Sequence, residues 1–154
     1  MLAKAVDQLP GQPLLYEPKW DGFRCIVFRD GDTVTLTSPN SRPFNRYFPE
    51  LLQPLLAHLP QRSVIDGEIV MPTSRGLNSL ALQMRLHPAE SRVALLAAES
   101  PASFVAFDVL ALNDTDFRPI PLSERRRKLE LALENSAPPI YRTPTSRDKT
   151  QGLA

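Results

Sequence analysis

The chain has 154 residues, of which 42% are hydrophobic and 23% are charged, and its formal net charge is +1. This length and composition are typical of one globular domain, or most of one, and the charge does not by itself indicate a nucleic-acid-binding protein. Cys25 is the single cysteine, which excludes an internal disulfide bond. No apolar stretch reaches the roughly 18 residues of a membrane helix, and residues 1–7 lack the apolar segment of a secretion signal. We therefore predict a cytoplasmic protein without a membrane partner.

The C-terminal part of the sequence is more basic than the rest. From Arg118 onward there are eight lysines or arginines and four acidic residues, whereas residues 1–117 carry ten and thirteen. Such a segment is suited to face phosphate groups, but a solvated helix face explains it equally well.

Hydrophobic periodicity predicts both strands and helices along the chain. Asp30-Gly31 is a hairpin turn signal between two predicted strands, and Ser123 is a suitable N-cap for the last helix. In that helix Leu129 and Leu133 are expected to face inward, while residues 125–128 stay solvated. The predicted strands are 14–17, 23–28, 33–37, 63–70 and 102–112, and the predicted helices are 51–59, 78–86, 89–99 and 124–134.

Hairpins mixed with helices favour an α+β fold with mainly antiparallel sheets. The 16 prolines lie mostly between apolar runs, where they separate short elements. Residues 1–135 are expected to form the folded part, and 136–154 a loop-like C-terminal segment without a closing element. The predicted fold is therefore incomplete at its C-terminus.

Residues 17–24, Glu-Pro-Lys-Trp-Asp-Gly-Phe-Arg, form the most informative stretch. Lys19 stands between two carboxylates, beside a tryptophan and at the head of an apolar run. A partly desolvated lysine amine loses its proton near neutral pH and becomes a nucleophile. The alternative is a surface lysine paired with its neighbours, because structural ion pairs also perturb lysines.

Two later predicted strands carry further candidate residues. Glu68, in Asp66-Gly67-Glu68, has apolar neighbours, and a carboxylate buried there would need a sugar hydroxyl, a metal ion or an arginine as partner. The alternative is an exposed glutamate on an edge strand. Gly67 lets a ligand or another backbone approach closely. Phe107, in Phe107-Asp108, is either a ring that stacks on a base or a core residue.

Arg24 and Arg42 are candidate phosphate ligands because the guanidinium fork matches phosphate oxygens, although each is as readily a surface arginine. His58 and His87 are too isolated to form a zinc site. The sequence contains neither a P-loop nor a Rossmann glycine fingerprint. A nucleotide would therefore be held by another scheme.

Taken in order, these motifs resemble the covalent nucleotidyltransferases, and within them the ATP-dependent DNA ligases. Each motif is weak alone, but four in the expected order with sensible spacing are specific. The resemblance spans nearly all of residues 1–135 and is strongest to small bacterial ligases of end joining and repair. The segments that carry it are 19–24, 41–42 with 47–51, 66–68 and 104–110, together with the connecting segments 82–86 and 121–126.

This resemblance implies an ATP-grasp-like nucleotidyltransferase domain with antiparallel sheets flanked by helices. It also implies that Lys19 is the catalytic nucleophile, which attacks the α-phosphate of ATP, expels pyrophosphate and holds AMP. AMP would pass to the 5′-phosphate of nicked double-stranded DNA, and the neighbouring 3′-hydroxyl would then displace AMP and seal the strand. Mg²⁺ would offset the charge on the phosphates.

Five further site residues are implied by the resemblance. Glu17 would lie at the adenine edge, Arg24 at the ribose or phosphate side of the nucleotide, and Arg42 at a phosphate of ATP or of the nick. Glu68 would hold the ribose hydroxyls or a metal-bound water. Phe107 would stack on adenine, a contact worth roughly 1–3 kcal/mol.

The sequence also departs from the family pattern. After Phe107 we recognise neither the later glutamate-glycine motif nor the paired-lysine motif, and no oligonucleotide-binding-fold domain follows. The chain thus resembles the N-terminal part of a ligase adenylation domain, and alone it is expected to bind nucleotide weakly at best and not to ligate efficiently. A non-catalytic nucleotide- or DNA-binding module derived from a ligase is the alternative, followed by a relative that acts on RNA ends or forms RNA caps with GTP.

The resemblance further implies nicked DNA and end-joining or repair proteins as partners. The corresponding processes are DNA repair and recombination. The expected location is the bacterial cytoplasm, in association with the nucleoid.

Overall fold

The computed structural model describes residues 5–8, 13–87, 89–148 and 150. The chain forms two units: residues 1–19 with 143–154, and residues 20–142. In the first unit the backbones of Tyr16 and Ser146 form two hydrogen bonds, of 2.8 and 2.9 Å. The second unit carries the helices and strands, which are, in chain order, β1 (Phe23–Asp30), β2 (Thr33–Thr37), the 3₁₀ helix η1 (Pro49–Leu51), α1 (Leu52–His58), β3 (Arg62–Val70), β4 (Pro72–Thr73), β5 (Gly76–Leu77), α2 (Ser79–Met84), α3 (Glu90–Glu99), β6 (Ser103–Leu112), β7 (Thr115–Asp116), α4 (Leu122–Ala132) and β8 (Ile140–Arg142).

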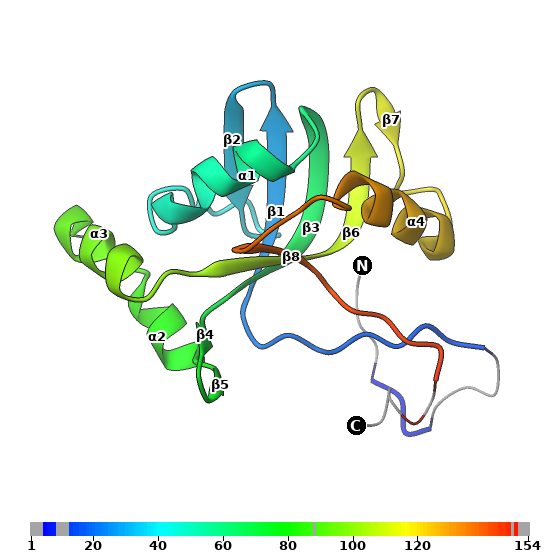
Figure 1. Ribbon diagram of the computed structural model, residues 1–154, viewed down its shortest axis with the longest axis horizontal. Helices are drawn as coiled ribbons and strands as arrows, with labels where there is room; N and C mark the ends of the chain where they lie inside the picture. Colours follow the sequence, from blue (N-terminus) through cyan, green and yellow to red (C-terminus); the bar gives the residue numbers. More distant parts are fainter. Residues whose placement is uncertain (1–4, 9–12, 88, 149, 151–154) are drawn as a thin grey trace. The chain divides into compact units, whose positions relative to one another are not determined.

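The larger unit is built on a twisted sheet in the order β2-β1-β3-β6-β7 (Figure 1). Neighbours along this order are antiparallel, and β8 adds a parallel pair to β6. Helices α1 and α4 lie over one face, where Leu55 and Leu129 join the core. The predicted α+β fold, with an antiparallel sheet flanked by helices, is confirmed.

Side chains alternate between the two faces of the sheet, as extended backbone requires. On β1, Cys25 and Val27 point into the core beneath the helices, whereas Arg24, Ile26 and Phe28 belong to the opposite face. We call that opposite face the outer face. Its hydrophobic positions are only partly covered, and Phe28 remains 44% exposed.

Two bulges in β6 change which of its residues reach the outer face. Gly67 pairs with Ala106 and Asp66 with Asp108, so Phe107 is the extra residue of the first bulge. A bulge leaves one residue unpaired and re-aims the side chains around it. Phe107 follows the core residue Ala106 onto the outer face near Arg24, and after the bulge Val109 returns to the core. Asp108 bonds to Arg125 of α4.

Gly67 in β3 and Gly22, just before β1, allow neighbouring parts of the protein to approach closely. A Cβ on Gly67 would overlap the Phe104 ring and lie 2.5 Å from the Val105 carbonyl oxygen. A Cβ on Gly22 would overlap the Ile69 carbonyl oxygen. Of the two interpretations open for Gly67, the structure supports approach of another backbone.

The free edge of β2 is covered by its own following loop. The Asn45 amide accepts a 2.7 Å bond from the Leu36 N–H and donates a 2.8 Å bond to the Val34 carbonyl. The Phe44 N–H donates to the Leu36 carbonyl at 2.8 Å. These bonds satisfy backbone groups that an edge strand otherwise leaves open.

Several local predictions were wrong. Residues 14–17 contain a single bridge at Tyr16 instead of a strand, and the expected C-terminal loop contains β8. Helix α4 begins at Leu122, so Ser123 lies within its first turn and makes no capping bond. No helix in the described part of the chain combines the length and apolarity needed to cross a bilayer.

Candidate nucleotide-binding site

The outer face carries a bidentate ion pair between Arg24 and Asp66, called the fork below. The Arg24 Nε donates to Asp66 Oδ1 at 3.1 Å, and Nη2 donates to Oδ2 at 2.7 Å. The Asp66 side chain is 1% exposed and that of Arg24 is 29% exposed. Bidentate pairs of this kind fix the plane of the guanidinium as well as its position.

Glu68 and Phe107 lie next to this fork. Glu68 is directly opposite Arg24 in the register of β1 and β3, and it is half-buried. The Phe107 ring, also half-buried, has its centroid 5.9 Å from the Arg24 Cζ. The structure therefore brings together three of the predicted site residues, and an aromatic face beside a guanidinium is suited to a nucleotide base and its phosphates.

The electrostatics of this cluster favour a permanently charged arginine. Hydrogen bonding to Asp66 raises the pKa of the Arg24 guanidinium, and the charges of Asp66, Glu68 and Asp108 act in the same direction, while burial opposes them. The cluster therefore presents a fixed positive charge between carboxylates.

The predicted nucleophile belongs to the terminal unit. Lys19 is exposed and Glu17 is half-buried, and both precede β1 in irregular backbone. The expected desolvation of Lys19 is wrong, because Lys19 itself is exposed between the exposed Pro18 and the half-buried Trp20, and the apolar run begins only with β1. Its role as nucleophile stays a prediction.

Two other motif residues form hydrogen bonds, Asp21 through its side chain and Arg42 through its backbone. The Asp21 carboxylate accepts a 2.6 Å bond from the Ser79 hydroxyl at the start of α2. Arg42 is exposed in the loop after β2, where its N–H bonds the Ser38 hydroxyl at 3.1 Å and its carbonyl accepts from the Ser38 N–H at 2.9 Å. No described contact joins the Arg42 side chain to the Arg24 cluster, so its predicted phosphate contact is untested.

The donor set for a metal is small. Within the described ranges, no three His, Cys, Asp or Glu side chains gather in a way that would hold a metal ion. Asp66 is paired with Arg24, and Glu68, opposite Arg24 in the register, is the other carboxylate of the cluster. One carboxylate together with nucleotide phosphates is a donor set that Mg²⁺ accepts in nucleotide sites.

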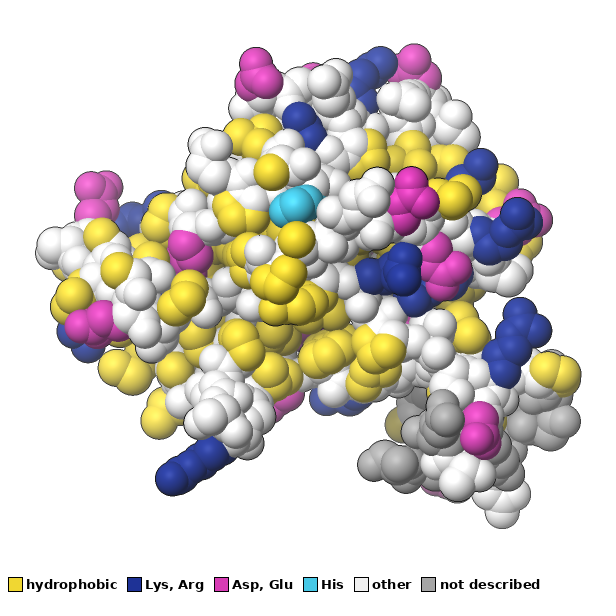
Figure 2. Space-filling view, viewed as in Figure 1, with side chains coloured by type: hydrophobic (Ala, Val, Ile, Leu, Met, Phe, Trp, Pro, Cys, Tyr) yellow, Lys and Arg dark blue, Asp and Glu magenta, His cyan; other side chains and the backbone are white. Residues whose placement is uncertain are grey.

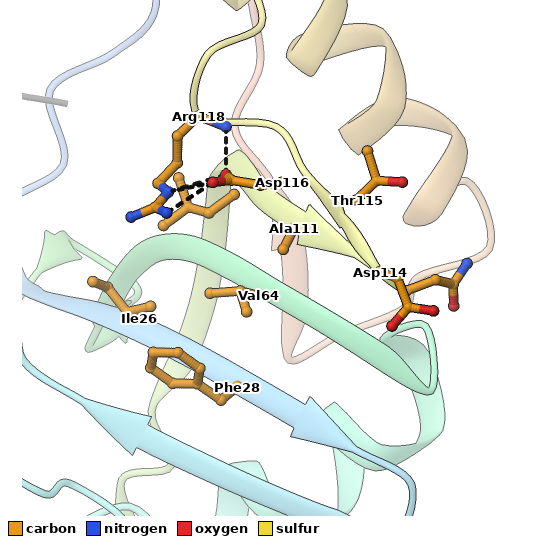
Figure 3. A pocket seen from close by; sticks show the side chains of 10 residues that line it. Ile26, Phe28, Val64, Ala111, Asp114, Thr115, Asp116 and Arg118 are labelled. Atoms are coloured by element: carbon orange, nitrogen blue, oxygen red, sulfur yellow. Dashed lines mark hydrogen bonds and ion pairs between the residues drawn. The ribbon is translucent and has the colours of Figure 1, made fainter.

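A shallow hollow of about 510 Å³ extends the outer face beyond this cluster. Its floor is apolar, with Ile26, Phe28 and Val64 from neighbouring strands, and its rim is polar (Figure 3). At the rim, Arg118 forks onto Asp116 and lowers the pKa of that carboxyl to about 2. The candidate site is therefore continued by an open apolar surface.

Sequence reasoning missed the partners of two buried aspartates. Asp66 and Asp108 were noticed in their motifs, but their arginine partners follow from strand pairing and helix docking, which no local pattern encodes. Arg125 donates to Asp108 at 2.8 and 2.9 Å, and the buried Arg126 donates to Glu130 at 2.8 Å. The prediction that 125–128 stay solvated was thus wrong for its first two residues.

The same fold occurs in solved ligase structures. The ligase domain of *Mycobacterium tuberculosis* LigD matches with a TM-score of 0.67 and 27% identity, over 90% of this chain and 42% of that chain. A mycobacterial DNA ligase D complexed with ATP and MES matches with the same score, identity and coverage.

The sequence comparisons identify the family. The family model of the ATP-dependent DNA ligase domain matches residues 1–151, and the chain belongs to that family. DNA ligase C of *Mycobacterium tuberculosis* is 55% identical over 152 residues, and DNA ligase C2 of *Mycolicibacterium smegmatis* is 55% identical over 148. Each alignment covers 96% of this chain and 42% of the relative, so the chain spans less than half the length of these relatives.

Proposed function

We propose that this chain is the nucleotide-binding part of an ATP-dependent DNA ligase adenylation domain, in which Lys19 becomes covalently linked to AMP. The observation that carries the proposal is the cluster of Arg24, Glu68 and Phe107 on one sheet face. They lie on three consecutive strands of the sheet, β1, β3 and β6, and β1 directly follows the lysine motif. A fixed guanidinium, a carboxylate and an aromatic ring are the groups that a bound ATP requires.

The covalent step is a displacement at the α-phosphorus of ATP. The neutral Nζ of Lys19 forms a bond to phosphorus, the bond to the bridging oxygen breaks, and pyrophosphate leaves with the electron pair. The amine proton passes to solvent, which reaches Lys19 because this side chain is exposed. Division of a difficult transfer into two steps through a covalent intermediate is ordinary nucleophilic catalysis.

The remaining residues bind and orient the nucleotide. Phe107 stacks on adenine, Glu17 contacts the adenine edge, and Arg24 contacts the ribose or phosphate side. Glu68 binds the ribose hydroxyls or a metal-bound water, and Arg42 binds a phosphate. Glu68 and the ATP phosphates would hold Mg²⁺, which offsets phosphate charge when bound.

The substrate that follows from this assignment is nicked double-stranded DNA. The 5′-phosphate at the nick takes AMP from Lys19, which recovers its proton, and the 3′-hydroxyl then forms the phosphodiester bond and releases AMP. Repair and recombination are the processes that present such nicks, and end-joining or repair proteins are the proposed partners. The names of the DNA ligase relatives and the ATP-bound ligase structure support this assignment.

The decisive test places this chain in a complete ligase. A chimera carries the 154 residues in place of the matching segment of *Mycobacterium tuberculosis* DNA ligase C, with which it shares 55% identity. Incubation with ATP and Mg²⁺ should add one AMP, seen by intact-mass spectrometry, and Lys19→Ala should abolish the adduct. A folded chimera that gains no AMP would refute the proposal.

The exposure of Lys19 favours one second candidate, a module that binds nucleotide or DNA without catalysis. Such a module would bind ATP or nicked DNA but form no covalent adduct in the chimera. The same experiment therefore separates the two functions when ATP affinity is measured alongside the mass.

A further inference from the structure

We propose that Asp66 is a positioning residue, which holds the Arg24 guanidinium beside Phe107 so that it meets the nucleotide in a fixed orientation. This inference rests on the proposed function, because it assigns a purpose to a residue of that same site.

The Arg24–Asp66 fork is rigid because separating its two partners costs free energy. The Asp66 carboxylate is 1% exposed, and a buried carboxylate deprived of its cation is strongly destabilising. Two bonds, of 3.1 and 2.7 Å, fix the guanidinium plane. Arg24 is therefore oriented before any ligand arrives, and this reduces the ordering cost of binding.

A second fork in the same sheet provides a comparison. Asp108 lies opposite Asp66 in the register of β3 and β6, and its side chain is also 1% exposed. Arg125 donates two hydrogen bonds to this carboxylate, as Arg24 does to Asp66. Arg125, however, is 13% exposed and also donates to the Ile120 carbonyl, so its donors are directed into the protein. That fork anchors helix α4 to the sheet.

The fork at Asp66 has a different setting. Its arginine is 29% exposed, lies on the outer face and stands 5.9 Å from the centre of the half-buried Phe107 ring. The Arg24 guanidinium thus lies on the outer face, where a ligand would bind, whereas the Arg125 guanidinium is directed towards the interior of the protein. The contrast between two otherwise equivalent pairs assigns Asp66 to ligand positioning.

Asp66→Asn in the 154-residue chain tests this inference. The amide removes the fork but leaves a charged arginine that solvent can reach, so the protein should fold. The neutral pair Arg24→Gln with Asp66→Asn is the reference for complete loss of the guanidinium, and Asp108→Asn is the matched control for loss of a buried fork. ATP affinity is measured by titration followed in ¹H–¹⁵N spectra, and folding by thermal unfolding.

We expect Asp66→Asn to weaken ATP binding by about tenfold, which corresponds to the loss of one charge-assisted hydrogen bond. This loss should be nearly as large as that of the double variant Arg24→Gln with Asp66→Asn. The Arg24 Nε–H signal should broaden through solvent exchange in this variant. Asp108→Asn should lower the unfolding temperature comparably but weaken ATP binding far less.

Two results would overturn the inference while leaving the proposed function intact. In the first, Asp66→Asn binds ATP as tightly as wild type while the double variant binds it weakly. The Arg24 guanidinium would then contribute to binding without being oriented by Asp66. In the second, the neutral pair also binds like wild type, so that Arg24 is not part of the site. A wild-type chain and chimera that both fail to bind ATP would refute the proposed function itself, and this inference with it.

Discussion

Phe107 illustrates how alternation along a strand supplies an aromatic side chain to a binding surface. Phe104 and Ala106 are both in the core, so alternation along β6 places Phe107 on the outer face, next to Arg24. The bulge, in which Phe107 is the unpaired residue, shifts the alternation after it, and Val109 returns to the core. Its half-exposed ring therefore contributes little to the core and is available to a ligand.

Replacement of this ring should affect binding more than stability. Phe107→Leu is expected to weaken ATP binding by about tenfold, since base–aromatic stacking is worth roughly 1–3 kcal/mol. Phe107→Trp, which keeps an aromatic face, is the control and should retain most of the affinity. Fluorescence titration with a labelled ATP analogue measures both, and equal affinities for the leucine and tryptophan variants would exclude stacking.

Because of Cys25, the free energy of unfolding is expected to depend on pH in the alkaline range. Burial raises the pKa of its thiol to about 12, with smaller contributions of the same sign from Asp66 and Glu68. An unfolded thiol ionises near pH 8.5. The folded state thus holds more protons above that pH, and the free energy of unfolding should fall as pH rises from about 8.5 towards 12.

The expected slope is at most about 1.4 kcal/mol per pH unit. Urea unfolding at a series of pH values measures it, and Cys25→Ala is the control because it removes this titration while other groups remain. Parallel pH profiles for wild type and Cys25→Ala would contradict the prediction.

Among the elements, η1 and the C-terminal end of α2 are joined by a buried ion pair between Glu50 and Arg85. Arg85 is 1% exposed and donates to both carboxylate oxygens of Glu50 at 2.8 Å, and also to the carbonyls of Tyr47 and Ser100. Glu50 in turn accepts the Ala102 N–H at 3.0 Å, just before β6. The pair therefore links segments from three parts of the sequence.

Removal of one partner should be more damaging than removal of both. Arg85→Met is expected to cost about 3–5 kcal/mol of unfolding free energy, because it leaves the Glu50 charge uncompensated. The double variant Arg85→Met with Glu50→Gln should recover part of this loss. Urea unfolding provides the comparison, and a double variant less stable than Arg85→Met would show that the charge itself is not the cause.

The elements that the sequence predicted well are those with a strong local period. Alternation defined the strand at 33–37, apolar runs defined the strands around Cys25 and Ile65, and helical spacing located α1, each to within a few residues. The strand at 140–142 was missed because it pairs in parallel with β6 from far along the chain, and such pairing leaves no local signature. The strand at 14–17 was overpredicted because apolar residues alone do not supply a pairing partner.

The candidate site was predictable in its composition but not in its internal bonding. The motifs identified Arg24, Glu68 and Phe107, which the fold does bring together. The role of Asp66 was not predictable, since it depends on a diagonal contact across β1 and β3. The exposure of Lys19 also could not be inferred, because it depends on the path of the irregular backbone before β1, which the apolar run that follows in sequence does not determine.

At the scale of the whole molecule, charge is mixed and not concentrated. Figure 2 shows basic and acidic side chains side by side over α4, where Arg127 and Lys128 are exposed. With a net charge of +1, this chain lacks the strong positive field that drives tight binding of DNA.

We therefore expect weak binding of a nicked duplex by the 154-residue chain, with a dissociation constant of about 10⁻⁴–10⁻⁶ M at physiological salt that rises with salt. Fluorescence anisotropy at several salt concentrations measures this. Lys128→Glu tests whether α4 faces the phosphates, with Arg92→Glu on α3 as the matched charge reversal. Salt-independent affinity would contradict phosphate contact, and equal effects of the two reversals would indicate net charge alone.

Asn45 has a consequence for how copies of this protein meet at high concentration. Its amide and the neighbouring Phe44 N–H already engage the polar groups of Val34 and Leu36 along the border of the sheet. An extended peptide, or the same sheet edge of another copy, would have to displace these bonds before it could pair with β2 as an added strand. The protein thus carries its own barrier against amyloid-like stacking on this side, built from one carboxamide and one backbone N–H.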